Sequence, residues 1–202
     1  MNSGATTDRV YAALKRRVMN HEFRPGARLD PAVLAGSLSS SVTPVRDALH
    51  MLAGEGLVEA RVSDGFHLPA VDEPGLKDLY AWMNEVLSLA LQGRVSGRTT
   101  VDAPEAAPLG TAAERAADLF ARIGAQSSNT EHERAIRALN ARLHPLRVVE
   151  PHVLKDIEEE VQAIAECVAA GDVADARRLI RTYHRRRKRS AAAIVRALYR
   201  AE

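Results

Sequence analysis

The sequence has one cysteine, few aromatic residues and no long apolar run, and each of these features excludes or disfavours a class of protein. Cys167 is the single cysteine in 202 residues, which excludes an intramolecular disulfide and favours a reducing compartment. No apolar run approaches the roughly 18 residues that a membrane span needs, and the N-terminus shows no signal-peptide core. We therefore expect a soluble, cytoplasmic protein in which Cys167 is a buried, unreactive thiol within an apolar helix.

The composition favours helices and gives no overall sign of nucleic-acid binding. Aromatic residues make up 4% and hydrophobic residues 46%, with abundant alanine, whereas strands favour β-branched and aromatic side chains. The net charge is +2, with 8 Arg and Lys against 7 Asp and Glu in residues 1–70. A mainly α fold is predicted, and any DNA-binding argument depends on motif and placement.

Two helices are predicted before residue 40. Apolar residues in residues 6–22 recur on one helical face. These residues are Val10, Leu14 and Val18. The Pro25-Gly26 pair indicates a turn. Asp30 can then cap a short second helix, with Pro31 in its first turn, where a missing N–H is harmless.

The segment SSSVTPVRDALHMLAGEGLVEARVSDGFHLP, residues 39–69, predicts a third helix followed by a hairpin. Ser41 or Thr43 can cap the helix, and Pro44 lies in its first turn. The predicted buried stripe is Val45, Leu49 and Leu52. The residues predicted to lie off that stripe are Arg46, Asp47, His50 and Met51.

Gly54 and Gly56 are predicted to end the helix. Two strand-like pieces, GLVEARV (which begins at Gly56) and FHLPAV, come next and are joined by SDG, a hairpin turn signal. Helix, helix, tight turn, helix and hairpin is the order of a winged helix-turn-helix. We therefore assign residues 1–71 to a DNA-binding domain, with the third helix in the major groove and the hairpin as the wing.

Residues 72–202 predict an all-helical second domain without further strands. An amphipathic helix begins near Asp72, and a Gly-, Pro- and Thr-rich loop is expected at 93–110. The later helices are predicted at about 111–126, 130–143, 149–170 and 173–200, with breaks at SSN, HP and GD.

These motifs resemble the GntR family of transcription regulators. The resemblance rests on VYAALKRRVMNHEFRPGARL and on VLAGSLSSSVTPVRDALHMLAGEGLVEARVSDGF, while CVAAGDVADARRLIRTYH resembles the FadR-like (FCD) branch. It implies a homodimer, more often a repressor, that binds a pseudo-palindromic double-stranded DNA operator. It also implies a small-molecule effector, held inside the C-terminal effector-binding and dimerisation domain, that modulates DNA affinity.

The same resemblance places DNA-binding residues in the third helix and the wing. Thr43 and Arg46 occupy recognition-helix positions, and Ser41 stands at the cap. Gly65 is the wing glycine, whose backbone can approach the minor groove closely because it has no side chain. Arg61 and His67 flank the wing, where they are expected to reach phosphates.

Three positions depart from the family pattern in the DNA-binding part. Val42 and Ala32 stand where relatives carry arginine, and Asp64 stands where a basic residue is common. Each phosphate contact is worth about one unit of log–log salt slope, so the loss of contacts is expected to lower affinity strongly at physiological salt. Weaker, more salt-sensitive binding or an altered operator is predicted, because Val42 can pack on a thymine methyl in place of reading guanine.

The effector domain also departs from the family pattern. The four places that resemble the family's metal ligands are here Ala116, Phe120, Val161 and Tyr183. A shift of one residue adds only His184 beside Glu160, and two ligands do not make a site. No metal or other cofactor is therefore expected. Met83 replaces a common arginine, so the predicted effector pocket is an apolar one, formed by Met83, Phe120, Val161 and Tyr183.

Several alternatives stay open at this stage. A TetR-like regulator shares the N-terminal motif but leaves the hairpin unexplained. A helical ligand-sensing or partner-binding protein with weakened or lost operator binding fits the three departures. An enzyme is not expected, since no nucleophile elbow, phosphate loop or HExxH is present.

The basic tract near the C-terminus and five of the histidines are predicted to be structural or surface features and not functional sites. The basic tract HRRRKR, 184–189, is predicted to be a solvated helix face or an intersubunit ion-pair surface in preference to a DNA contact. Five histidines stand at no metal-ligand spacing and are expected at the surface or at helix ends. These are His21, His50, His132, His144 and His152.

Overall fold

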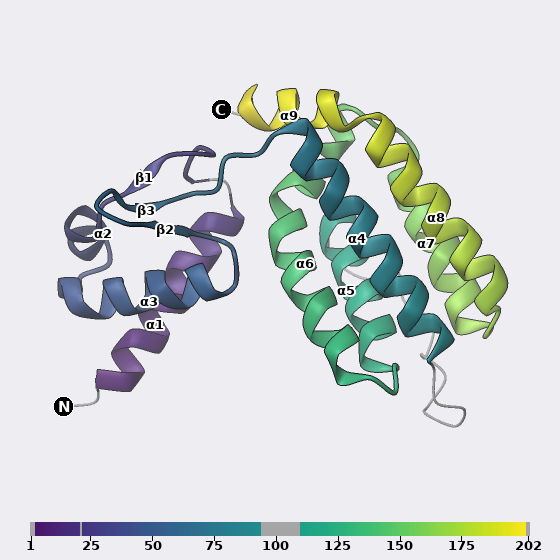
Figure 1. Ribbon diagram of the computed structural model, residues 1–202, viewed down its shortest axis with the longest axis horizontal. Helices are drawn as coiled ribbons and strands as arrows, with labels where there is room; N and C mark the ends of the chain where they lie inside the picture. The colour runs from purple at the N-terminus through teal and green to yellow at the C-terminus, as the bar shows by residue number, and fades with distance from the viewer. Residues whose placement is uncertain (1–2, 21, 94–109, 201–202) are drawn as a thin grey trace. The chain divides into compact units, whose positions relative to one another are not determined.

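The computed structural model describes residues 3–20, 22–93 and 110–200 and divides the chain into two compact units, Met1–Val71 and Asp72–Glu202 (Figure 1). His21 and all but the ends of the expected 93–110 loop lie outside the described residues.

The N-terminal unit contains the three predicted helices, α1 (Ser3–Met19), α2 (Pro31–Ser37) and α3 (Val42–Gly54). The apolar face of α1 is buried and α1 packs on α3, as the spacing of its apolar residues predicts. Helix α2 begins as expected, because Asp30 Oδ1 accepts a hydrogen bond from the Ala32 amide at 2.8 Å.

A tight turn joins α2 to α3. Ser39 adopts a left-handed conformation with φ +48°, and the Ser40 amide donates to the Ala35 carbonyl at 3.0 Å. Ser41 then takes the extended N-cap position of α3, but its hydroxyl makes no capping hydrogen bond. The predicted position of the cap is correct, whereas the predicted side-chain cap is not made.

The wing belongs to a three-stranded antiparallel sheet of order β1-β3-β2. The strands are β1 (Arg28–Leu29), β2 (Glu59–Arg61) and β3 (Gly65–His67). The two hairpin strands are as predicted, although shorter. Strand β1 was not predicted, because two residues are too few to show an alternating pattern.

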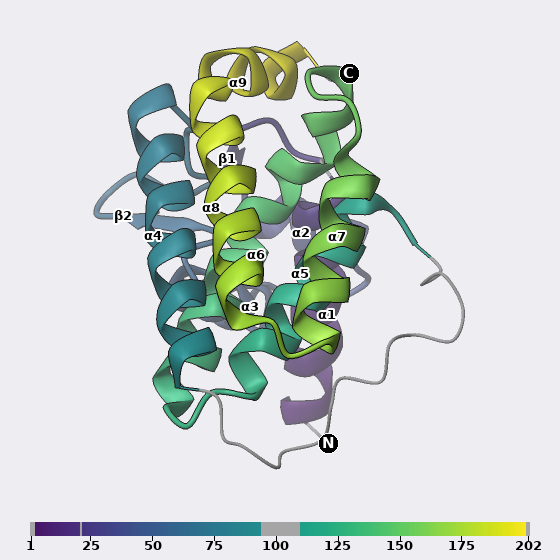
Figure 2. The same ribbon diagram turned by 90° about the vertical axis from the view of Figure 1, so that its right-hand side faces the viewer.

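The C-terminal unit is helical throughout its described residues. Its elements are α4 (Glu73–Gln92), α5 (Ala112–Ala125), α6 (Thr130–Val149), the 3-10 turn η1 (Glu150–His152), α7 (Ile157–Ala169), α8 (Val173–Arg189) and α9 (Ala191–Arg200). Helices α4 to α8 lie side by side in a bundle, and α9 crosses one end of it (Figures 1 and 2).

Three predicted boundaries in this unit are wrong. Helix α6 continues through Pro145, since Leu143 and Leu146 are buried on either side and their packing outweighs a proline cost of about 3 kcal/mol. The helix predicted from 149 begins only at Ile157, after Asp156 turns the backbone to φ +54°. The last predicted helix is interrupted at Ser190.

Cys167 on α7 is half-buried, so the expectation of a fully buried thiol is wrong. Burial, reinforced by the charge of Asp175, nevertheless raises the pKa of the thiol. No helix in the described part of the chain is both long enough and apolar enough to cross a membrane.

Candidate DNA-binding surface

Helix α3 has one buried and one exposed face. Val45, Leu49 and Leu52 are wholly buried, which confirms the predicted stripe. The opposite face is exposed and carries Val42, Thr43, Arg46, Asp47 and His50. A helix anchored through its apolar stripe can therefore present short polar and apolar side chains to a groove of DNA.

Arg46 is the cation on this exposed face. It forms no hydrogen bond or ion pair with any residue that the structure describes. The sequence also allows Arg46 to form a local ion pair with Asp47 or Glu55. Neither pair is present among the described residues, and the Glu55 carboxylate instead binds Lys15 at 2.7 Å and the Tyr11 hydroxyl. The Arg46 guanidinium therefore has all its donors available to a phosphate or a guanine.

The backbone at the tip of the β2–β3 hairpin is exposed and can lie close to DNA. Gly65 has φ +82° and lies exposed, and Ser63 is also left-handed with φ +66°. A side chain at Gly65 would be strained in this conformation. Val62 beside the turn is 96% exposed, so the tip presents an apolar side chain as well as bare backbone.

The wing's charges are paired within the wing itself. Arg61 NH2 lies 2.8 Å from Glu59 Oε2, and its NH1 lies 3.9 Å from Asp64 Oδ2. Both partners of Arg61 are surface carboxylates, and such exposed pairs are worth at most about 1 kcal/mol. Arg61 is exposed and can exchange these partners for a phosphate.

His67 differs from its prediction. Its side chain is buried, with 6% of the residue exposed, and Nε2 lies 3.4 Å from Asp64 Oδ2. A phosphate contact requires an accessible ring nitrogen, so the structure contradicts that predicted role. The burial follows from the sheet, since β3 lies between β1 and β2 and His67 pairs with both.

Sequence reasoning missed Arg28, which the sheet brings to the wing. Arg28 is exposed on β1, and its Nε lies 4.0 Å from where a Cβ on Gly65 would stand. A second missed feature is an open groove of about 490 Å³ between α1 and the α2–α3 turn, with Arg9 and Arg16 in its lining. Neither feature had a local sequence signal, because both join segments distant in the chain.

Two of the positions that depart from the family pattern, Ala32 and Val42, lie on the exposed surface, where they lower its positive charge. Ala32 and Val33 leave an exposed part of α2 without a cation, and Val42 is exposed at the first position of α3. The cations at this surface therefore come from Arg46, from Arg61 and from the unpredicted Arg28.

A helix-turn-helix with an exposed third helix and a glycine-containing wing defines the N-terminal unit as a winged helix-turn-helix DNA-binding domain. Residues 6–68 match the family model described as bacterial regulatory proteins, gntR family. The N-terminal unit therefore resembles the DNA-binding part of the GntR family over nearly its whole length.

Known proteins agree with this assignment. The chain is 39% identical over 77 residues to an HTH-type transcriptional regulator in an unstable DNA locus of Streptomyces ambofaciens, covering 38% of this chain and 33% of that one. It is 31% identical over 70 residues to the HTH-type transcriptional regulator YdhC of Bacillus subtilis, covering 35% and 31%. The matches thus span about a third of these curated relatives.

The fold of the whole chain also has a solved counterpart. A transcriptional regulator GntR from Rhodococcus sp. RHA1 superposes with a TM-score of 0.70 at 19% identity, over 94% of this chain and 98% of that one. At this identity the likeness shows the fold alone, and it extends to the helical C-terminal unit.

The residues predicted to line an effector pocket are all in the interior of the C-terminal unit. They are Met83 on α4, Phe120 on α5, Val161 on α7 and Tyr183 on α8. The structure brings the Phe120 and Tyr183 rings to 5.5 Å between centroids, and the His184 ring lies 5.8 Å from Phe120. Two of the four predicted residues therefore meet, around a histidine.

These positions do not fit a metal. Ala116, Phe120 and Val161 carry no ligand atom, and among the described residues no group of three or more His, Cys, Asp or Glu side chains comes together. Elsewhere, His132 Nδ1 lies 2.8 Å from Ser127 Oγ at the start of α6, while His50 and His152 are exposed.

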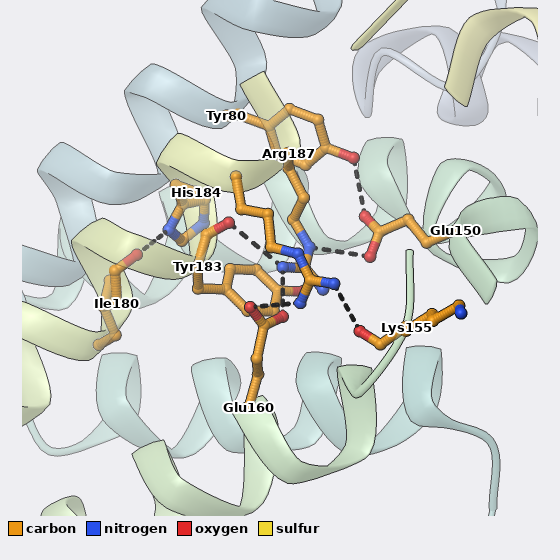
Figure 3. Close-up of polar contacts among 9 residues, drawn as sticks. Tyr80, Glu150, Lys155, Glu160, Ile180, Tyr183, His184 and Arg187 are labelled. Atoms are coloured by element: carbon orange, nitrogen blue, oxygen red, sulfur yellow. Dashed lines mark hydrogen bonds and ion pairs between the residues drawn. The ribbon is translucent and has the colours of Figure 1, made fainter. Parts of the chain in front are cut away.

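The basic tract 184–189 is not simply a solvated face. His184 and Arg187 are buried, and Arg187 pairs with Glu150 at 2.8 Å and with Glu160 at 2.9 Å (Figure 3). Arg186 bonds Glu160 and the Lys155 carbonyl. The prediction is wrong for these three residues, because the helical spacing turns one side of the tract into the bundle.

Proposed function

We propose that the chain is a sequence-specific, DNA-binding transcriptional regulator. The observation that carries this proposal is the exposed face of α3, where Arg46 has no partner among the described residues, in a unit that matches the family model of gntR regulatory proteins. The exposed Gly65 wing beside the exposed Arg28 supports it, since a bare backbone and a cation suit a phosphate-lined groove.

The regulator acts in the cytoplasm as a homodimer and most simply as a repressor. One α3 reads only a few base pairs, so two copies placed about one helical turn apart are needed for a specific site, and a two-fold dimer matches a pseudo-palindromic operator. The helical C-terminal unit supplies the pairing and holds a small-molecule effector that changes DNA affinity.

DNA binding is expected to be weak at physiological salt, or directed to an unusual operator. Ala32 and Val42 remove cations from the surface, and Asp64 holds Arg61 and His67 within the wing. The exposed Val42 at the start of α3 favours contact with a thymine methyl.

The test is selection of bound sequences from random duplex DNA by the full chain, with and without a panel of metabolites, at several salt concentrations. An enriched motif with two-fold symmetry is expected, with enrichment that falls steeply as salt rises. The absence of any enriched motif at low salt would overturn the proposal.

That outcome would favour the second candidate, a ligand-sensing or partner-binding helical protein that has lost operator binding. Its support is the same set of substitutions, Ala32, Val42 and Asp64. The presence of Arg46 and of the left-handed turn at Gly65 supports the regulator instead, because a protein that no longer binds DNA would require neither.

We also propose that the protein holds no metal ion or other resident cofactor. The side chains at Ala116, Phe120 and Val161 support this, since none can ligate. Metal analysis of the purified chain should find far less than one equivalent, and one tightly held equivalent per chain would contradict the proposal.

A further inference from the structure

The open groove between α1 and the turn that joins α2 to α3, here named the α1 groove, is lined by two cations and by small side chains. Its volume is about 490 Å³. One wall is a face of α1 that carries Arg9, Ala12, Ala13 and Arg16, and the other wall is the turn, residues 37–39. Because the alanine side chains are short, the space between the two arginines stays open.

The two arginines of the α1 groove have little compensation from the described residues. Arg16 is exposed, and its side chain forms no hydrogen bond or ion pair with any of them. Arg9 is also exposed, and its guanidinium donates one long hydrogen bond, at 3.5 Å, to the Leu38 carbonyl. The lining of the groove contains no carboxylate. The α1 groove therefore carries a positive charge that its own lining does not neutralise.

The other two cations of α1 lie outside the groove lining and are paired. Lys15 lies 2.7 Å from a carboxylate oxygen of Glu55. Arg17 lies 2.7 Å from a carboxylate oxygen of Glu22 and donates to the Ser37 hydroxyl at 2.9 Å. Within one helix, the cations outside the groove have carboxylate partners and those inside it have none. The groove arginines are therefore available to an anion from outside the chain.

The turn adds hydroxyl donors and connects the α1 groove with the exposed face of α3. Ser39 is exposed, and its hydroxyl makes no hydrogen bond with a described residue. Ser41 and Thr43 follow at the exposed start of α3, where the Ser41 hydroxyl makes no capping hydrogen bond. A run of exposed hydroxyl groups thus leads from the groove to the helix that is proposed to read DNA.

The spacing of Arg9 and Arg16 suits the phosphates of a DNA strand. The two residues lie about two helical turns apart, which separates them by about 10 Å along the helix axis. Successive phosphates of one strand rise about 3.4 Å along the duplex, so one strand offers a different phosphate to each arginine. An acidic protein segment would also attract these cations, but it would leave the continuity with α3 unexplained.

We propose that Arg9, Arg16 and Ser39 bind phosphates of the DNA strand that borders the site of α3, as a contact separate from the third helix and the wing. Contacts to phosphates hold the protein on the duplex and carry no base information. They replace part of the positive charge that Ala32 and Val42 remove from the surface. This inference rests on the proposed function, because it takes α3 as the helix that reads DNA.

The test is a fluorescence-anisotropy titration of the full chain with the selected operator and with a random duplex of equal length, over a range of salt concentrations. Arg9→Ala and Arg16→Ala should each weaken binding to both duplexes about three- to tenfold at ~0.15 M salt and make the log–log salt slope shallower by about one. The ratio of the two affinities should keep its wild-type value. Unchanged affinity and slope in the double variant would overturn the proposal.

Two further variants separate a phosphate contact from a general loss of charge. Arg16→Lys keeps a cation in the groove and should retain most of the salt slope. Arg137→Ala removes an exposed arginine from α6 and should change neither affinity nor slope. Circular dichroism establishes that each variant is folded. If Arg137→Ala weakened binding as much as Arg16→Ala, net charge and not the groove would be responsible, which contradicts the proposal.

Ethylation interference locates the contacts on the DNA. Ethylation of phosphates beside each half-site should block binding of the wild-type chain, and some of these positions should lose their effect in the double variant. An interference pattern identical in both proteins would contradict the assignment.

The two duplexes distinguish failure of this site from failure of the proposed function. Preference for the operator that does not depend on Arg9 or Arg16 would overturn this site alone. Equal binding to both duplexes that depends on the two arginines would overturn the sequence-specific regulator and leave the site standing. Absence of binding to either duplex at low salt would overturn both.

Discussion

Glu150 and Arg187 form an ion pair in the interior of the C-terminal unit, with Oε2 and Nε 2.8 Å apart and side chains 1% and 0% exposed. The Tyr80 hydroxyl donates to the other Glu150 oxygen at 2.8 Å. Three elements, α4, η1 and α8, are thus joined by one carboxylate (Figure 3). Burial, with the charge of Glu150, raises the pKa of Tyr80 well above its ordinary value.

Glu150→Gln should lower the free energy of unfolding by about 3–5 kcal/mol, because it removes the charge that compensates the fully buried Arg187. Urea unfolding followed by circular dichroism measures this. Glu158→Gln is the control, since Glu158 is exposed in its pair with Arg115 and should cost at most about 1 kcal/mol. A Glu150→Gln loss no larger than the control's would show that Glu160 alone neutralises Arg187.

His184→Asn should flatten the dependence of stability on pH in mildly acidic solution. Burial lowers the pKa of His184 to about 3, against an ordinary value of 6.5. Below pH 6.5 His184 binds a proton in the unfolded chain but stays neutral in the folded chain. The contribution of His184 to the free energy of unfolding is therefore fully present above pH 6.5 and is lost progressively as the pH falls toward 3. The slope approaches about 1.4 kcal/mol per pH unit.

Urea unfolding of both proteins from pH 7 to pH 4 provides the comparison. The asparagine amide retains the hydrogen bond to the Ile180 carbonyl but does not titrate. Parallel curves for the two proteins over this range would mean that His184 becomes protonated in the folded state.

Arg46→Ala should weaken binding to the selected operator by about 1–3 kcal/mol and relax sequence preference at one position in each half-site. Gel-shift titration with the operator and single-base variants measures both effects. Arg137→Ala removes another exposed arginine, from α6, where it pairs with Glu133, and should leave binding unchanged. Wild-type affinity in Arg46→Ala would mean that another side chain faces the groove.

Asp64→Asn should strengthen DNA binding about three- to tenfold at ~0.15 M salt and steepen the log–log salt slope by about one. The reason is that Asp64 lies near both Arg61 and His67 and repels phosphates, so its neutralisation frees the wing cation. The control is Glu131→Gln, a surface carboxylate paired with Arg134 in the C-terminal unit. Lower affinity in Asp64→Asn would instead indicate that Asp64 accepts a hydrogen bond from a base or orders the turn.

The DNA-binding unit was largely predictable because its signals are local. The spacing of Val45, Leu49 and Leu52 sets which face of α3 is buried, and the SDG turn sets the hairpin. What escaped prediction depends on contacts between distant segments. Arg28 reaches the wing only through the β1–β3 pairing, and the same pairing buries His67.

The interior of the C-terminal unit was predicted less well for a related reason. The spacing of apolar residues predicts which helix face is buried, but it does not reveal that an arginine lies on that face. Arg147 and Arg187 were therefore not identified as buried. Their burial depends on what the neighbouring helices provide, an amide in one case and two carboxylates in the other. Similarly, the packing around Pro145 overrides a local break that the residue alone would favour.

Lys15 and Tyr11 on α1 both bind Glu55, the residue that follows α3. They thereby hold the end of α3 against α1, far from the start of the helix, where Val42 and Thr43 stand. The residues that hold α3 in place are therefore different from those expected to contact the DNA bases. Substitution of Val42, Thr43 or Arg46 changes no buried side chain and no residue of the Lys15–Tyr11–Glu55 cluster. The operator preference can therefore diverge, or be redesigned, without a change in the packing of the fold.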